Sequence, residues 1–181
     1  ESVALITGSI MSKKLAANPS GVVISVGCGT GAFMHTLDRA RELAHSMSNV
    51  ATGAGIPSVI MITELNSVLG TTVEMIETVD FLTGAERDPR VLELVLELTS
   101  EIIVLAGLAA SLEEAHAIAL EQLESGRAAA KFGEIMAAQG CPGDFVENAR
   151  DHLPSAAVIR PVEPTMAGHL ASMDTTDVGL T

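Results

Sequence analysis

The sequence predicts an α/β fold in which helices flank a parallel sheet. Two short apolar runs, residues 21–26 and 56–63, are rich in β-branched side chains and begin next to glycine or proline, which predicts buried strands. A helical repeat separates them, and the order strand, glycine loop, helix, strand is typical of a parallel βαβ unit with a right-handed crossover. From residue 74 onwards the pattern is mostly helical. The 181 residues suffice for one domain with a substantial core.

Two helices are predicted around these strands. Apolar residues recur at helical spacing near the start of the chain, and Asn18 followed by proline stops the pattern, so a helix is expected over residues 3–17. Thr36 stands where it can cap a second helix, over residues 37–55, in which apolar residues again repeat at helical spacing.

The remainder of the chain predicts four more helices and one more strand. Asp88 can cap a helix whose first residue is proline, and Ser111 with Glu114 forms a capping box. The expected elements are helices over 73–84, 88–108, 111–126 and 127–140 and a strand over 155–162, followed by a polar tail.

Composition argues against several classes of partner. A net charge of −13 and an aromatic content of 2%, with no Trp or Tyr, disfavour nucleic acid. No apolar run approaches the roughly 20 residues of a membrane span, although mean hydropathy is +0.39. Cys28 and Cys141 lie far apart and belong to no metal-binding pattern, and the chain opens without a leader pattern. We therefore expect no nucleic acid, membrane or metal partner, and a cytoplasmic location.

The glycine loop, residues 27–31 within VVISVGCGTGAF, has two interpretations from the residues alone. Such a loop between a strand and a helix can hold S-adenosylmethionine, as in many methyltransferases, and Glu64 follows the second strand where an acidic residue could bind the ribose hydroxyls. Methyltransferase loops usually have an acidic residue just before the glycines, where this chain has Ser25. The alternative is that the glycines only permit a tight turn.

Six segments carry a resemblance over most of the chain. LITGSIMSKKLAA, VGCGTGAFMHT, ARELAHSMSNVATGAGIPSVIMITELNSVLG, VEMIETVDFLTGAERDPRVLELVLEL, AAQGCPGDFVEN and LPSA follow one another in this order. In order and spacing they resemble the middle and later part of the thymidine and pyrimidine-nucleoside phosphorylases, from residue 1 to about residue 179. In this alignment GTGAFM corresponds to the family's GSGAFM, so the likeness to a methyltransferase loop is coincidental.

The resemblance implies a transferase of nucleoside salvage that acts on pyrimidine nucleosides. Thymidine or uridine reacts with inorganic phosphate, which is the co-substrate, to give the free base and a sugar 1-phosphate without a cofactor. Residues 1–17 would be one helix of a mostly lost α-domain, and residues 18–181 an incomplete α/β domain. The chain would be a fragment or truncated member of the family, working as a cytoplasmic homodimer.

The resemblance also implies which residues bind the base. Ser9 and Lys13 in SIMSKK match the family's base-recognition serine and lysine, and their i, i+4 spacing places them on one helix face. Lys13 would be catalytic, because its ammonium group can stabilise negative charge that develops on the departing base. Ile6, Ile10 and Phe33 match apolar positions that line the family's base pocket.

Three departures from the family pattern leave a second function open. Ser25 and Gly27 stand where the family usually has Asp and Lys, and the segment after TELNSVLG is about four residues shorter. The family's phosphate-binding loop and a base-contacting arginine correspond to sequence upstream of residue 1, and a C-terminal portion is missing. We therefore expect no phosphate-binding residue in this chain, and a non-catalytic homologue with a binding or assembly role is the alternative.

A monovalent cation is bound by some family members through two backbone carbonyls and a glutamate. The matching positions are Leu69, Thr72 and Glu77. From the residues alone, Glu74 and Glu77 predict a solvated helix face, and the five histidines show no spacing typical of a triad or a metal site.

Overall fold

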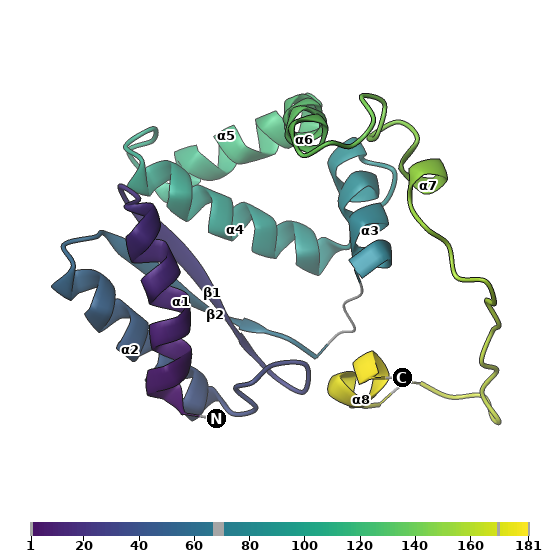
Figure 1. The fold of residues 1–181 in the computed structure, drawn as a ribbon, viewed down its shortest axis with the longest axis horizontal. Helices are drawn as coiled ribbons and strands as arrows, with labels where there is room; N and C mark the ends of the chain where they lie inside the picture. Colours follow the sequence, from purple (N-terminus) through teal and green to yellow (C-terminus); the bar gives the residue numbers. More distant parts are fainter. Residues whose placement is uncertain (1, 67–70, 170, 181) are drawn as a thin grey trace. The chain divides into compact units, whose positions relative to one another are not determined.

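The computed structural model describes residues 2–66, 71–169 and 171–180. The chain divides into two compact units, and Figure 1 shows their elements. The first unit comprises Glu1–Val68, Pro89–Leu120 and Asp174–Thr181, and the second comprises Leu69–Asp88 and Glu121–Met173.

The first unit is built on a two-stranded parallel sheet. Strand β1 (Val22–Cys28) pairs with β2 (Ser58–Glu64) in a register that runs from Val22 opposite Ser58 to Cys28 opposite Glu64. The parallel βαβ unit is therefore confirmed, and with it the α/β fold class. The helices of this unit are α1 (Val3–Ala17), α2 (Leu37–Gly53), α4 (Pro89–Leu105) and α8 (Thr175–Leu180).

Helices cover both faces of this sheet. Because strand side chains alternate between faces, Ile24 and Val26 point to one side, where they join the core formed with α1 and α2. Helix α4 contacts both strands, and its last residue, Leu105, lies against Gly21. Gly21 is an odd-numbered position, so it faces the side of the sheet opposite to Ile24 and Val26. The buried residues of the α1 and α2 side are Val3, Met11, Val26, Met34, Ala40, Leu43, Met47 and Ala51.

The helix boundaries follow the caps that the sequence contains. Helix α1 ends at Asn18, which adopts a left-handed conformation (φ 49°) and donates its N–H to Leu15 O at 3.0 Å. The Thr36 side chain accepts the N–H of Arg39 at 3.4 Å at the start of α2. Both caps confirm the predicted helices. The assignment of residues 1–17 to a separate α-domain stays a prediction. In the structure, α1 packs on α2 and shares its core.

The second unit contains α3 (Thr71–Thr83), α6 (Arg127–Ala138) and α7 (Ala149–His152), with α3 packing on the other two. Helix α5 (Leu112–Glu124) begins in the first unit and ends in the second. Its capping box is present in a shifted form: Ser111 Oγ accepts Glu114 N–H at 3.2 Å, but the Glu114 carboxylate accepts the N–H of Ala110. The four predicted later helices are thus confirmed.

The predicted strand over residues 155–162 is wrong. This segment has no regular structure, and its large apolar side chains are exposed, Val158 at 67% and Val162 at 97%. A strand needs a hydrogen-bonded neighbour, and no described segment of the chain pairs with it. Two short helices, α7 and α8, were not predicted because four and six residues are too few to show a helical repeat. Within the described chain, none of the helices has the length and apolar character required to cross a membrane.

Candidate functional site

Helix α1 presents Ser9 and Lys13 to solvent, one turn apart. The opposite face of the helix is fixed in the core through Thr7 and Met11, which are 4% and 1% exposed. Burial of that face therefore forces Ser9 and Lys13 outwards. The Ser9 carbonyl accepts the Ser12 hydroxyl at 3.4 Å. Lys13 makes no ion pair with any side chain that the structure describes, so both functional groups are available to a ligand.

Ile6 and Ile10 lie along the edge of that exposed face. Both are half-buried and pack against the core of the first unit. They share the helix with Ser9 and Lys13 at spacings of three or four residues, so the four side chains form one continuous patch. The patch thus combines half-buried apolar surface with two exposed polar side chains.

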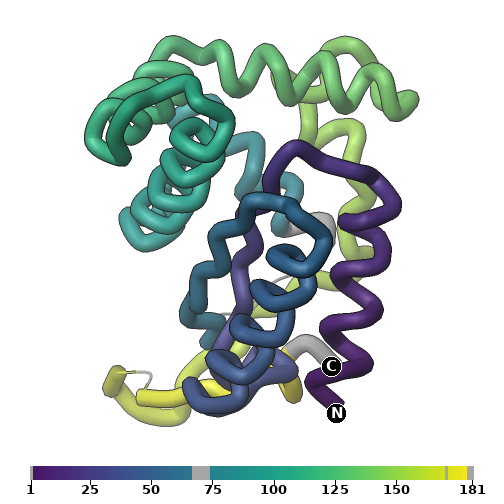
Figure 2. The backbone as a smooth tube through the Cα atoms, turned by 90° about the vertical axis from the view of Figure 1, so that its left-hand side faces the viewer, coloured from purple at the N-terminus to yellow at the C-terminus, as the bar shows by residue number. Residues whose placement is uncertain are grey.

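Phe33 lies outside α1. Its side chain is 75% exposed in the loop that joins β1 to α2, and Figures 1 and 2 show that loop beside the N-terminal end of α1. Lys13 is ten residues further along the helix than Val3, which corresponds to roughly 15 Å of rise. The structure therefore places four of the five residues implied by the resemblance on one helix, and the loop that carries the fifth, Phe33, lies beside the other end of that helix from Lys13.

Four successive backbone amides of the glycine loop, from Gly29 to Ala32, are used within the chain. Gly29 N–H donates to Met34 O at 3.1 Å, and Ala32 N–H donates to Gly29 O at 3.1 Å. Thr30 N–H donates to Asn66 Oδ1 at 2.9 Å, and Gly31 N–H to Leu65 O at 3.0 Å. Helix α2 begins only at Leu37, so the loop does not lie at a helix N-terminus. This arrangement gives no support to a methyltransferase cofactor loop, which needs free amides.

Gly29 is required by this geometry. Its φ is +145°, and a Cβ at this position would lie 2.4 Å from Asn66 Oδ1 and 2.5 Å from Leu65 O. Only glycine permits so close an approach of two backbone segments. The glycine thus serves the turn, which is the second interpretation of the loop.

Glu64 is engaged in a polar network at the carboxyl ends of the strands. Its carboxylate forms an ion pair with Arg90 at the start of α4 and accepts the Asn66 side-chain amide at 2.5 Å. Because Asn66 donates to Glu64, its carbonyl oxygen is turned towards Thr30. Asn66 was missed in the sequence, where its place two residues after a strand was the only available signal.

Ser25 and Gly27, which stand where the resemblance implies an aspartate and a lysine, contact uncharged side chains. The Ser25 hydroxyl lies 2.7 Å from the Thr63 hydroxyl on the neighbouring strand. A Cβ at Gly27 would lie 3.1 Å from Leu65 Cδ2, so a lysine here would require Leu65 to move. The Ser25 side chain is thus paired with another hydroxyl, and Gly27 packs against the apolar side chain of Leu65.

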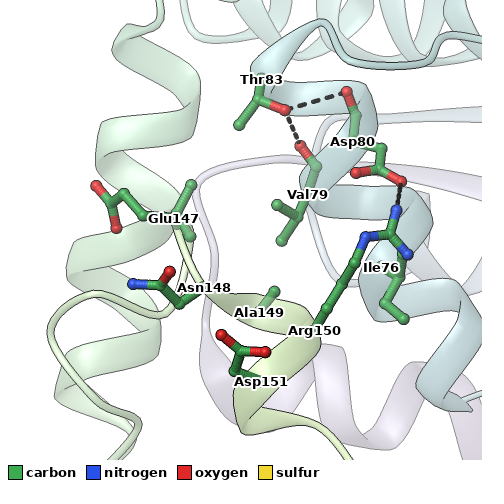
Figure 3. A pocket seen from close by; sticks show the side chains of 10 residues that line it. Ile76, Val79, Asp80, Thr83, Glu147, Asn148, Ala149, Arg150 and Asp151 are labelled. Carbon is green, nitrogen blue, oxygen red and sulfur yellow. Dashed lines mark hydrogen bonds and ion pairs between the residues drawn. The ribbon is translucent and has the colours of Figure 1, made fainter.

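A pocket of about 440 Å³ lies in the second unit between α3 and residues 146–151 (Figure 3). An ion pair of 2.5 Å between Arg150 and Asp80 crosses it, and Thr83 Oγ1 donates to Val79 O at 2.7 Å. None of the residues implied by the resemblance lines this pocket. Two of its polar side chains, Arg150 and Asp80, bond to each other, which is consistent with a role in packing.

His152 is a structural residue next to this pocket. Its Nε2 lies 3.0 Å from Asp144 Oδ1, and its ring stacks on Phe145 with centroids 6.4 Å apart. Hydrogen bonds from Asn148 and then His152 lower the pKa of the Asp144 carboxyl. This cluster joins both ends of the 144–152 segment.

The cation positions implied by the resemblance can be only partly placed. Leu69 lies outside the described residues, whereas Thr72 and Glu77 fall within α3, where Glu77 is exposed. Across residues 2–66, 71–169 and 171–180, there is no group of three or more His, Cys, Asp or Glu side chains that could hold a metal ion.

Comparison with known families identifies the fold around the α1 patch. The sequence profile described as "Glycosyl transferase family, a/b domain" matches residues 3–129, more than two thirds of the chain, and the match includes α1, the glycine loop and both strands. This family covers thymidine phosphorylases and anthranilate phosphoribosyltransferases, which indicates transfer of a pentosyl or phosphoribosyl group. The chain belongs to the glycosyl transferase family and contains its a/b domain.

Proposed function

We propose that this chain supplies the base-binding part of a pyrimidine-nucleoside phosphorylase. The reaction cleaves thymidine or uridine with inorganic phosphate into the free base and a sugar 1-phosphate. Pentosyl transfer is the function class of the family, and the exposed Ser9–Lys13 pair on α1 is the observation that carries the finer assignment.

The chemistry of the pair fits a departing pyrimidine. As the glycosidic bond stretches, negative charge develops on N1 and the ring carbonyl oxygens, and a positioned cation stabilises this charge more than it stabilises the neutral ground state. Lys13 supplies the ammonium group, and the Ser9 hydroxyl can donate to or accept from the base edge. Ile6 and Ile10 supply apolar surface beside them.

The wider proposal rests on the resemblance. It includes a homodimer acting in the cytoplasm in nucleoside salvage, with phosphate as co-substrate and no cofactor. It assigns no phosphate-binding residue to this chain. Phe33 is included as a base-pocket residue on the same ground, although its loop lies at the other end of α1 from Lys13.

A non-catalytic role in binding or assembly is the second candidate. The observation that favours it is the neutral Ser25–Thr63 pair, at 2.7 Å, in a position where the family usually has an aspartate. Loss of that charge, with Gly27 in place of lysine, would leave a base-binding surface without full catalytic machinery.

The test is release of free base by the purified intact protein. Thymidine and uridine are incubated with and without phosphate, and base and sugar 1-phosphate are quantified by chromatography. Phosphate-dependent release of both products supports the proposal, and base binding in a calorimetric titration without phosphorolysis favours the second candidate. Saturable S-adenosylmethionine binding that Gly29→Val abolishes would contradict both.

A further inference from the structure

The end of the chain docks on the glycine loop. Residues 174–178, here called the C-terminal latch, reach Thr30 across about 145 positions of sequence within the first unit. The hydroxyls of Thr175 and Thr30 lie 2.7 Å apart, and Thr175 N–H donates to Thr30 Oγ1 at 3.4 Å. Thr176 Oγ1 donates to Thr30 O at 2.6 Å. Three hydrogen bonds between two short segments indicate specific docking.

The shapes of the two segments are also matched. Thr175 is 7% exposed, and its methyl carbon lies 3.0 Å from where a Cβ on Gly31 would be. A side chain at Gly31 would meet the latch on one side and Leu65 O, 3.3 Å from the same Cβ, on the other, so the glycine lets the loop fit between them. The latch itself is shaped locally, because Asp174 Oδ1 accepts the N–H of Asp177 at 3.1 Å.

The glycine loop is held from a second side by the segment after β2. Leu65 and Asn66 accept the amides of Gly31 and Thr30, as described above. The loop is thus clamped between this segment and the latch at the carboxyl ends of both strands. Open α/β sheets bind their ligands at that edge.

We propose that the C-terminal latch is a conformational device that fixes the glycine loop and, through it, the segment that carries Phe33. With the latch docked, the loop has one conformation and the enzyme is competent to bind the base. Release of the latch removes one side of this clamp, loosens the loop and weakens base binding. The effect on base binding rests on the proposed function, whereas the docking does not.

Hydrogen exchange of the loop amides in the intact protein tests the docking. Thr175→Val keeps the shape and removes the hydroxyl, and exchange across residues 30–32 is expected to rise about fivefold, the loss of one net hydrogen bond. Thr165→Val, on an exposed segment, is the matched control and leaves loop exchange unchanged. Amides in α2 serve as the internal reference for folding.

A suppressor pair tests the close approach. Gly31→Ala places a methyl group against the Thr175 methyl, so loop exchange rises; adding Thr175→Ser removes that methyl, keeps the hydroxyl and restores protection. Unchanged loop exchange in both Thr175→Val and Gly31→Ala overturns the latch. A double variant that exchanges as fast as Gly31→Ala alone also overturns it.

The role in base binding has a separate readout. Thr175→Val is expected to raise KM for the nucleoside several-fold and to leave kcat unchanged, because a freed loop affects the site before chemistry. An unchanged KM in a variant with raised loop exchange overturns this role. If wild-type protein has no phosphorolysis, the proposed function fails, and the exchange data alone decide on the latch.

Discussion

The exposed face of α1 and the glycine loop are both sequences that suggest ligand binding, yet their polar groups are used in opposite ways. All four amides from Gly29 to Ala32 donate to acceptors within the chain, and the loop is clamped on two sides. Ser9 and Lys13 are exposed and point away from a well-packed core. A glycine-rich motif whose donors are already bonded is structural, while an exposed pair with free donors can recognise a ligand. Substitutions in the loop should therefore act mainly on stability and change base binding only through the position of the segment that carries Phe33, whereas substitutions on α1 should change activity directly.

The largest effect on stability is expected at Gly29. Gly29→Ala places a Cβ 2.4 Å from Asn66 Oδ1 at a φ of +145°, and we expect a loss of about 3 kcal/mol in the free energy of unfolding. Denaturant unfolding measures it. Gly8→Ala is the matched control, because Gly8 lies within α1 with open space around it, and it should stabilise by about 0.5–1 kcal/mol. Equal unfolding free energies for both variants would remove the structural role of the loop.

A smaller loss in the free energy of unfolding is expected when the hydrogen bonds between the glycine loop and the segment after β2 are removed. Asn66→Ala removes the acceptor of Thr30 N–H and the donor to Glu64, which should cost about 1 kcal/mol because water can replace part of these exposed bonds. Asn49→Ala, exposed on α2, is the control and should not lower stability. Loss of activity without loss of stability in Asn66→Ala would mean that the loop binds the ligand directly.

On α1, substitutions should change activity while leaving stability nearly unchanged. Ser9→Ala should change the free energy of unfolding by less than about 0.5 kcal/mol, because the side chain is exposed, but should raise KM for the nucleoside about tenfold through a lost hydrogen bond. Ser12→Ala, one turn along, is the matched control. If both serine variants behave alike in the assay, Ser9 does not contact the base.

The smallest effect on stability is expected at Asp144 in the second unit. Since Asn148 and His152 lower the pKa of Asp144 in the folded state, its stabilising contribution is present above the ordinary carboxyl pKa of about 3.9. That contribution is lost as the pH falls through the folded pKa. Asp144→Asn should therefore be slightly less stable than wild type at pH 7, and the difference should shrink below about pH 4. A difference that is constant with pH would exclude the charge as its origin.

Local signals in the sequence predicted most of the fold. The Asn18-Pro19 stop, the Thr36 cap and the capping box at Ser111 each act within a few residues, and the helices begin or end where these signals lie. The segment over 155–162 has the composition of a strand but no partner, and pairing depends on the rest of the fold. The contact of Thr175 with Thr30 likewise depends on tertiary structure and has no local signal.

The part of the candidate site that lies on one helix could be predicted from the sequence, whereas the part that depends on tertiary packing could not. Ser9, Lys13, Ile6 and Ile10 share one helix, so their spacing alone places them together. Phe33 belongs to a loop whose position relative to α1 is fixed by the packing of β1, which spacing cannot supply. The glycine loop was ambiguous because the sequence does not reveal that Leu65 and Asn66 take up its amides.

Lys13 acts on the departing base in the proposed reaction, and a comparison of two adjacent lysines tests this role. In the intact protein, kcat/KM for phosphorolysis of thymidine is measured for Lys13→Ala and Lys14→Ala, both exposed on α1, in samples shown to have the same unfolding midpoint. Lys13→Ala should lose about 100-fold or more, the effect of removing a group that stabilises developing charge, while Lys14→Ala stays within about twofold of wild type. Undiminished turnover in Lys13→Ala would contradict the account.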